Sequence, residues 1–240
     1  RRAGRFGRAS GKLCSKASGA VLVTASAAPY NPLDKMNLGK SVAQALLGQA
    51  VIAMTAIEEV RGAGVYAIYY TGPLPAYDPV AARNRNGEFG QPIYVGKAIP
   101  KGGRKGGITP DASMGTALRD RLRQHAASVE QASNLDLGDF YYRCLVVDDI
   151  WIPLGENMLI ETFRPIWNIV IDGFGNKNPD NRRATQYRSP WDVLHPGRSF
   201  ADKLADGGMT PVDVVRKLEQ YFAGLPASRI PEFNHVRWEN

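Results

Sequence analysis

The sequence has little cysteine and no long apolar segment. Its two cysteines, Cys14 and Cys144, are too few for a disulfide framework, and we expect two free thiols in a reducing compartment. No run of about 18 apolar residues occurs, which excludes a transmembrane helix. The Cys–His spacing of a zinc site and the glycine pattern of a nucleotide-binding phosphate loop are also missing. A globular protein remains, since 44% of the residues are hydrophobic and 22% are charged.

Positive charge is concentrated at one end of the chain. The formal net charge is +7, yet residues 1–33 carry six basic residues and no acidic one, so the rest of the chain holds 24 basic and 23 acidic residues. Because residues 1–33 are rich in Arg, Ala, Ser and Gly, we expect a flexible basic arm, with an organellar targeting signal as the alternative. Charge alone therefore does not identify a nucleic-acid-binding protein.

Three short runs of aromatic and β-branched residues predict strands. They are Val65–Tyr70, Ile93–Gly96 and Phe140–Val147. The first two are expected to pair as a hairpin with a long loop over residues 72–92, which hold four prolines and three glycines. The third is nearly all apolar or aromatic, so we expect it to be central and buried.

Helices are predicted where apolar residues recur at three- and four-residue spacing. They are expected over residues 37–60, 113–131, 154–163 and 211–222. Asn37 is the expected cap of the first helix, and Thr210 caps the last, with Pro211 at its first turn. A glycine-rich basic loop is expected at residues 101–107, because glycine loses too much backbone entropy in a helix or strand.

Two of the predicted strands place a tyrosine close to a glycine. Gly64-Val65-Tyr66 opens one strand, and Tyr94-Val95-Gly96 lies in the other with Lys97 directly after it. A glycine lets another backbone or a ligand approach a sheet closely. The alternative is that strands contain tyrosine and glycine without any function, so the pair alone is weak evidence for a site.

The helix predicted at residues 113–131 carries Arg121 and His125 four residues apart, and therefore on one face. Arginine suits a phosphate because its planar guanidinium gives two parallel charge-assisted hydrogen bonds. Histidine can donate to a phosphate oxygen or transfer a proton. The alternative is a solvated polar face, since Arg119 and Arg123 lie on the same helix.

The next predicted helix carries two carboxylates, Glu156 and Glu161, which are five residues apart and lie on different faces. They are not expected to share an ion. Because Mg²⁺ takes oxygen ligands and usually keeps several waters, one carboxylate can suffice at a nuclease site. The alternative for Glu156, near the helix start, is a favourable interaction with the helix dipole.

Taken in order, these motifs resemble the GIY-YIG nuclease superfamily. The matching series is Gly64-Val65-Tyr66, Tyr94-Val95-Gly96-Lys97, Arg121 with His125, Glu156-Asn157, and Pro165-Ile166-Trp167-Asn168. Each motif is weak alone, whereas five in this order on the expected elements are specific. Val stands in place of Ile in both halves of the name motif, and the 27 residues between Tyr66 and Tyr94 are a long span for the superfamily.

Within that superfamily, the chain resembles the type II restriction endonucleases of the branch that cuts CCGCGG. His125 stands where many relatives carry tyrosine, a helical extension precedes the core, and a long segment follows it. The resemblance implies an α+β fold, with a small mixed or antiparallel three-stranded sheet flanked by helices and with helical N- and C-terminal extensions. The implied parts are the arm (residues 1–33), a helical extension (34–60), the catalytic core (61–170), and a C-terminal DNA-binding and helical extension packed on the core (171–240).

The resemblance also implies roles at an active site. Tyr66 and Tyr94 would lie beside the attacking water, with Tyr66 as the general base or the group that orients the water. Because a phenol titrates near pH 10, Tyr66 needs a nearby cation, either Lys97 or the metal, to ionise. Arg121 would hold the scissile phosphate and stabilise charge in the transition state. His125 would hydrogen-bond the phosphate or assist the water.

One divalent ion per active site is implied, Mg²⁺ with Mn²⁺ as a substitute. Glu156 would bind it, and the metal would stabilise the leaving 3′ oxygen. Asn168 would orient a neighbour or contact the DNA.

Two basic loops are expected to contact double-stranded DNA. The candidates are Lys101, Arg104, Lys105, Arg182, Arg183, Gln186 and Arg188. Residues 101–105 are expected to grip phosphates. The irregular segment 172–198 also holds Lys177 and Arg198. Within it, we expect Arg182, Arg183 and Arg188 to include base readers, since arginine reads guanine bidentately and glutamine reads adenine. The alternative is that all of them contact phosphate or are free surface charges.

The implied activity is that of a prokaryotic, cytoplasmic type II site-specific deoxyribonuclease that leaves 5′-phosphate and 3′-hydroxyl ends at a GC-rich palindrome. Palindromic cutting implies a homodimer on DNA, and restriction implies a cognate methyltransferase encoded elsewhere. No membrane partner is expected. Two alternatives stay open, a GIY-YIG repair or homing nuclease and a non-catalytic DNA-binding module. The presence of Arg121 and Glu156 argues against the second.

Overall fold

A computed structural model describes residues 31, 33–57, 60–99, 115–176 and 187–224. Contacts divide the chain into two units, residues 1–31 and 32–240, and the helices and strands described belong to the second. Within these described ranges, no helix is long and apolar enough to cross a membrane.

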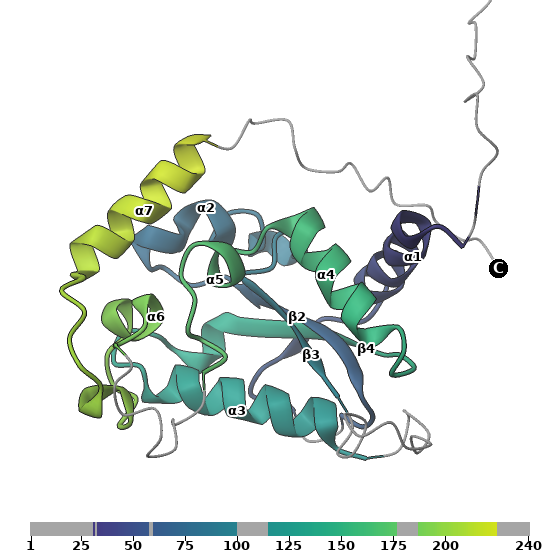
Figure 1. Ribbon diagram of the computed structural model, residues 1–240, viewed down its shortest axis with the longest axis horizontal. Coiled ribbons are helices and arrows are strands. Elements are labelled where there is room, and N and C mark those ends of the chain that lie inside the picture. Colours follow the sequence, from purple (N-terminus) through teal and green to yellow (C-terminus); the bar gives the residue numbers. More distant parts are fainter. Residues whose placement is uncertain (1–30, 32, 58–59, 100–114, 177–186, 225–240) are drawn as a thin grey trace, which may run out of the picture. The chain divides into compact units, whose positions relative to one another are not determined.

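The second unit is built on an antiparallel sheet of four strands in the order β1-β4-β2-β3 (Figure 1). The strands are β1 (Ile52–Ala53), β2 (Gly64–Tyr70), β3 (Tyr94–Ala98) and β4 (Phe140–Val146). The expected β2–β3 hairpin is confirmed, and β1 adds a short fourth strand to the three that were expected. The strand expected at 140–147 is central, because β4 lies between β1 and β2, but it is only partly buried, whereas every residue of β2 is buried.

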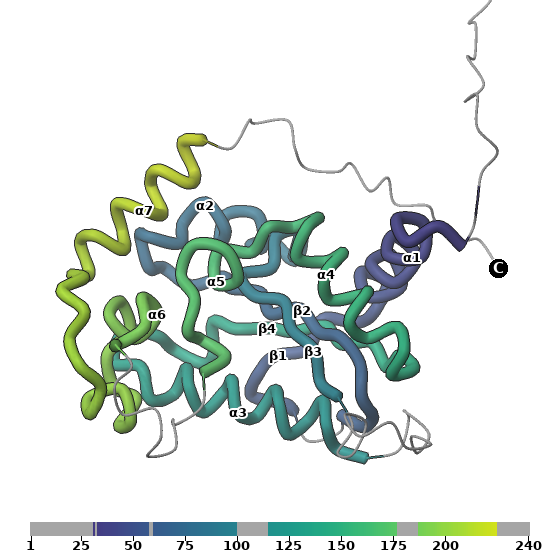
Figure 2. The backbone as a smooth tube through the Cα atoms, in the orientation of Figure 1, coloured from purple at the N-terminus to yellow at the C-terminus, as the bar shows by residue number. Residues whose placement is uncertain are grey.

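Side chains alternate along β2 and supply two separate cores, one on each face of the sheet. The even-numbered residues from Tyr66 to Tyr70 pack with α3 (Ala117–Gln131) and with the C-terminal part of the chain. The odd-numbered residues from Val65 to Tyr69 pack with α1 (Lys35–Leu47) and α4 (Ile152–Phe163). Figures 1 and 2 show α3 on one side of the sheet and α1 with α4 on the other.

The first helix is shorter than its periodicity predicts. α1 ends at Leu47, and its cap is Asp34, whose carboxylate accepts a hydrogen bond from the backbone nitrogen of Met36. The prediction of a helix over residues 37–60 capped by Asn37 is therefore wrong. Gly48 has a low helix propensity and follows the last turn, and the β-branched Ile52 after it pairs with β4 instead.

The connection between β2 and β3 contains short helices rather than the expected loop. They are η1 (Pro75–Tyr77), α2 (Asp78–Ala81) and η2 (Arg85–Gly87). The buried amide of Asn84 holds the connection closed. Its nitrogen donates to the carbonyl oxygens of Tyr70 and Gln91 at 2.9 and 2.8 Å, and its oxygen accepts from the Gln91 backbone at 3.0 Å.

The C-terminal part of the chain packs into the core on the α3 side of the sheet. Its elements are α5 (Ile166–Ile169), α6 (Pro190–Leu194), η6 (Ala201–Lys203) and α7 (Pro211–Gly224), while η4 (Leu137–Asp139) precedes β4. Trp191 on α6 and Leu218 on α7 join the hydrophobic cluster that contains Tyr66. The segment 172–198 is therefore not wholly irregular, because α6 lies within it, whereas α7 begins at Pro211 as predicted.

Candidate active site

Tyr66 lies in the middle of β2 with its phenol directed across β3. Gly96 is its partner in the register, and a Cβ atom added at Gly96 would lie 2.4 Å from the Tyr66 hydroxyl oxygen. Any side chain at that position would displace the phenol. The glycine of the second motif therefore makes room for the tyrosine of the first, which explains why the two motifs occur together.

The Tyr66 hydroxyl meets a histidine from α3. The distance from Tyr66 Oη to His125 Nε2 is 2.7 Å, and both side chains are buried. The His125 ring stacks on Phe174 with 4.4 Å between ring centroids and 18° between planes. The Tyr94 ring lies 6.3 Å from that of Tyr66 and 5.0 Å from that of His125. Side chains from β2, β3 and α3 thus form one aromatic cluster.

Burial shifts the pKa values of Tyr66 and His125 in opposite directions. It raises the pKa of Tyr66 well above its usual value, and Tyr94 raises it further, while the charge and hydrogen bond of Arg121 lower it. Burial lowers the pKa of His125 well below its usual value, with Arg121 and Arg198 adding to the effect. At neutral pH the phenol therefore keeps its proton and the imidazole is neutral, so Nε2 can accept a hydrogen bond from Tyr66.

Arg121 is partly buried beside this cluster. Its two terminal nitrogens donate to the side-chain oxygen of Gln124 and to the carbonyl of Gly175, each at 3.1 Å. A Cβ atom at Gly175 would lie 3.0 Å from both Arg121 Nη2 and Tyr94 Oη, so glycine allows this close approach. Because His125 is buried and Arg121 faces the two tyrosines, the alternative of a solvated helix face is wrong for this pair.

Glu156 on α4 forms an ion pair with Lys97 on β3. The distance from Lys97 Nζ to Glu156 Oε2 is 2.5 Å, with 35% of the lysine side chain and 16% of the glutamate side chain exposed. In the register Lys97 lies opposite Val65, so it belongs to the face of the sheet opposite Tyr66. The cation that lowers the pKa of Tyr66 is Arg121, whereas the negative charge of Glu156 raises it.

The residues present fit a single Mg²⁺ ion with few protein ligands. Across the part of the chain that the structure describes, no group of three or more His, Cys, Asp or Glu side chains could hold a metal. Glu156 could supply one hard oxygen ligand at the edge of the cluster, which would be enough where water and a substrate phosphate complete the shell. Glu161 is exposed on the same helix and has no part in this cluster.

Asn168 binds the backbone of the edge strand β3. Its side-chain oxygen accepts from the Val95 nitrogen at 2.8 Å, and its nitrogen donates to the Val95 carbonyl at 2.9 Å. The Trp167 backbone donates to the Ile93 carbonyl beside it. Asn168 therefore pairs with the strand as a further strand would, and fixes the segment that carries Tyr94 and Gly96.

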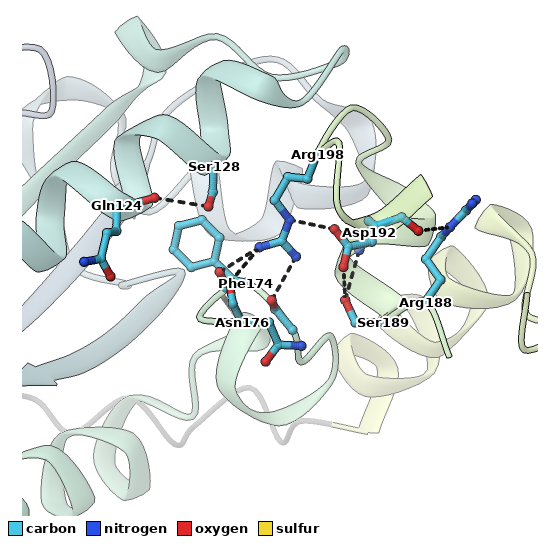
Figure 3. A network of polar contacts seen from close by, with 10 residues as sticks. Gln124, Ser128, Phe174, Asn176, Arg188, Ser189, Asp192 and Arg198 are labelled. Carbon is cyan, nitrogen blue, oxygen red and sulfur yellow. Dashed lines mark hydrogen bonds and ion pairs between the residues drawn. The ribbon is translucent and has the colours of Figure 1, made fainter. Parts of the chain in front are cut away.

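A cavity of about 240 Å³ opens beside Arg121 and His125. It lies between α3 and a C-terminal segment, and is lined by Arg121, Gln124, His125, Ala127, Ser128, Phe174, Gly175, Asn176 and Phe200. In Figure 3 Gln124 and Ser128 on α3 lie across from Phe174 and Asn176. The arginine thus lies at the junction of the aromatic cluster and a space open to a ligand.

Most of the expected DNA-binding residues lie outside the described residues, namely Lys101, Arg104, Lys105, Arg182, Arg183 and Gln186. Arg188 is described. It is partly buried, and its Nε donates to the carbonyl of Ala201 at 3.4 Å. Arg198, grouped with the basic residues of the segment expected to contact DNA, is buried and forms an ion pair with Asp192 at 2.6 Å. The sequence contained no motif that predicted the Arg198–Asp192 ion pair.

A family model described as the Eco29kI GIY-YIG domain matches residues 58–222, which is more than half of the chain. No curated protein sequence matches the chain. The match takes in β2, β3, β4, α3 and α4, and it also covers α6 and most of α7.

Proposed function

The chain belongs to the Eco29kI GIY-YIG domain family, and from this premise we propose that it is a Mg²⁺-dependent type II restriction endonuclease. The family makes it a nuclease that acts on DNA. The proposed reaction hydrolyses both strands to 5′-phosphate and 3′-hydroxyl ends at a GC-rich palindrome. The observation that carries the proposal is the convergence of a proton-transfer pair, an arginine and a carboxylate around β3.

The Tyr66–His125 pair would activate the attacking water. Because its pKa is raised, Tyr66 is not ionised beforehand, and it can take a proton from water only while it gives up its own. His125 is neutral, and its Nε2 lies 2.7 Å from the phenol oxygen, so it can receive that proton. Tyr66 would then contact the water, and His125 would act through Tyr66.

Arg121 would bind the scissile phosphate. Its guanidinium lies between the two tyrosines and the open cavity, where a phosphate oxygen can replace the Gln124 and Gly175 oxygens as acceptor. Because its charge is fixed and partly desolvated, it is placed to stabilise the negative charge that develops in the transition state.

Glu156 would hold the metal, and Lys97 would hold Glu156. A bound Mg²⁺ supplies a Lewis acid that stabilises the leaving 3′ oxygen. Lys97 keeps the carboxylate at the edge of the cluster through an ion pair that leaves the glutamate partly exposed. Tyr94, held by the clamp of Asn168 on β3, would pack beside the water and the phosphate.

Sequence recognition is proposed to come from the C-terminal extension. We propose that Arg182, Arg183 and Arg188 include the base readers, with residues 101–105 mainly binding phosphate. A homodimer on DNA would place two active sites about a two-fold axis, as palindromic cutting requires. A cognate methyltransferase would protect the same site in the host.

A plasmid digest with Mg²⁺ tests the proposed function, with Glu156→Ala as the matched control. Discrete fragments that end at one common sequence, lost in the variant, would establish a restriction enzyme. Nicks or smears without a common site would favour a repair or homing nuclease. DNA shifted on a gel without any cleavage would favour a binding module. Sedimentation of the complex tests the dimer, because one protomer per site would contradict it.

A further inference from the structure

Arg198 is a buried arginine far in sequence from the motifs of the site. It is 1% exposed and lies over the Trp191 ring, with its guanidinium carbon 4.4 Å from the ring centroid. Its Nε donates to the Asp192 carboxylate at 2.6 Å. Its terminal nitrogens donate to three backbone carbonyls, those of Gly173, Phe174 and Asn176, at 3.0, 3.2 and 3.4 Å. Figure 3 shows this arginine between the carboxylate and the turn.

The turn that Arg198 binds contacts the active site directly. Within residues 173–176, the Gly175 carbonyl accepts the hydrogen bond from Arg121, and the Phe174 ring stacks on His125. Phe174 also packs edge-to-face against Tyr94 with 5.1 Å between centroids. Arg198 binds one side of the turn 173–176, and Arg121 and His125 contact the same turn. The turn therefore links Arg198 to the active site.

We propose that Arg198, paired with Asp192, is a positioning residue that holds residues 173–176 against Arg121 and His125. The proposal rests on the proposed nuclease function. A guanidinium is suited to this role because its planar fork serves a carboxylate and several carbonyls at once, which a lysine ammonium does not. Asp192 is itself held by Ser189, whose hydroxyl donates to its second oxygen at 2.6 Å. The C-terminal extension is thus part of the catalytic apparatus.

The charge of Arg198 gives the proposal a second readout. The titratable and charged groups that face His125 are Tyr66 from β2, Tyr94 from β3, Arg121 from α3 and Arg198 from the C-terminal segment. Both arginines lower the pKa of His125, and Asp192 is the counter-ion of the second. Replacing Arg198 by lysine keeps the positive charge but loses the planar guanidinium. Such a variant therefore separates the positioning of the turn from the effect of the charge on the pKa of His125.

Steady-state cleavage by the full chain tests positioning. Arg198→Lys keeps the positive charge and loses the fork, and we expect kcat to fall roughly 10- to 100-fold, as for a small misplacement of a catalytic group. KM should stay within about threefold, since no DNA contact is lost. Arg216→Gln removes an arginine from an exposed ion pair on α7 and is the matched control, with kcat and KM unchanged. A rise in KM alone in Arg198→Lys, or an unchanged kcat, would overturn the proposal.

The double variant Arg198→Gln with Asp192→Asn keeps the test usable if the single variant does not fold, because it leaves no unpaired buried charge. In this double variant kcat should fall as in Arg198→Lys. The NMR titration of His125 should move to higher pH, whereas in Arg198→Lys it should stay at its wild-type position. An unchanged titration in the double variant would show that the Arg198–Asp192 pair has no net electrostatic effect on His125 and would overturn this second readout.

The proposed nuclease function and the proposed role of Arg198 can be contradicted independently. If the wild-type protein cleaves no DNA under any metal condition, the proposed function fails. The NMR shifts of the His125 ring protons, which depend on the stacked Phe174 ring, would still show in the same variants whether Arg198 holds the turn against the histidine.

Discussion

The hydroxyl of Tyr66 lies 2.7 Å from Nε2 of His125 in a buried setting. Burial disfavours the charged form of each partner, so it raises the pKa of the phenol and lowers that of the imidazole. The proton therefore rests on the phenol at neutral pH, and the histidine is ready to accept it. Nearby Arg121 favours the phenolate of Tyr66 and disfavours the imidazolium of His125. Binding of a substrate phosphate to Arg121 is therefore expected to alter the pKa of each residue.

Substitution of Gly96 should disturb Tyr66 directly. In Gly96→Ala the new methyl group would lie 2.4 Å from the Tyr66 hydroxyl oxygen, so the phenol must move. We expect kcat to fall by about 100-fold for a displacement of that kind. Gly48→Ala is the control, because its added methyl would meet only ordinary contacts at 3.6 Å. Steady-state cleavage assays would check this, and equal activity of the two variants would contradict it.

Stability should fall as the pH falls below about 6.5, where unfolded histidines titrate. Burial lowers the pKa of His195 to about 3 and that of His125 well below its usual value, so the unfolded chain binds protons that the native state does not. Each histidine contributes stability that is full above pH 6.5 and is lost at about 1.4 kcal/mol per pH unit below it. Urea unfolding at pH 7, 6 and 5 measures this loss.

His195→Gln is the control for the pH dependence, because it removes one of the two titrating groups and should leave about half of the slope. His195 is bound on both sides, by Tyr77 and by Asn134 at 2.8 Å, so the substitution will also lower the stability at pH 7. A free energy of unfolding that stays constant from pH 7 to pH 5 would show that neither histidine is held in its neutral form.

Removal of the Asn168 amide should loosen β3. Asn168→Ala leaves the nitrogen and the carbonyl of Val95 without their side-chain partners, at a cost of about 1–3 kcal/mol. Activity should fall as well, since Tyr94 and Gly96 lie on that strand. Gln49→Ala is the control, because the Gln49 side chain bonds a carbonyl at an exposed site, where substitutions change stability by less than about 0.5 kcal/mol. Equal unfolding midpoints for the two variants would contradict the clamp.

Lys97 should weaken metal binding while it holds Glu156. A cation must share or displace the lysine ammonium, which lies 2.5 Å from Oε2. An ion pair that is partly open to solvent contributes up to about 1 kcal/mol, so Lys97→Met should tighten Mg²⁺ or Mn²⁺ binding roughly two- to fivefold. Calorimetry measures the affinity without cleavage, and Glu156→Gln should abolish it. Weaker binding in Lys97→Met would show that the lysine helps to hold the metal.

The sequence predicted the sheet well and the connections poorly. Strong β-branched and aromatic runs marked β2, β3 and β4, because such residues fit a pleated and partly buried surface. The fourth strand, β1, has two residues and depends on pairing with β4, which no local pattern reveals. The early end of α1 was missed because the apolar spacing of residues 37–60 continues past Gly48 although the helix does not. Tertiary pairing outweighed periodicity there.

The candidate site divides in the same way. Short sequence motifs predicted five site residues, and the fold brings them close together. They are Tyr66, Tyr94, Arg121, His125 and Glu156. The Tyr66–His125 bond spans 59 positions, and the Arg198 network spans up to 25, so both depend on the tertiary structure. Arg198 was grouped with the possible DNA contacts because a buried arginine is rare and its partner Asp192 gives no sequence signal.

The most direct test of the central claim is a double-mutant cycle on Tyr66 and His125. Tyr66→Phe removes the hydroxyl, and His125→Gln keeps an acceptor near it but not a group that takes a proton. If the pair acts as one unit in proton transfer, each variant should lower the single-turnover rate by about 10²- to 10⁴-fold, and the double variant should be no slower than the worse single variant. Losses that multiply in the double variant, or full activity of His125→Gln, would contradict the account.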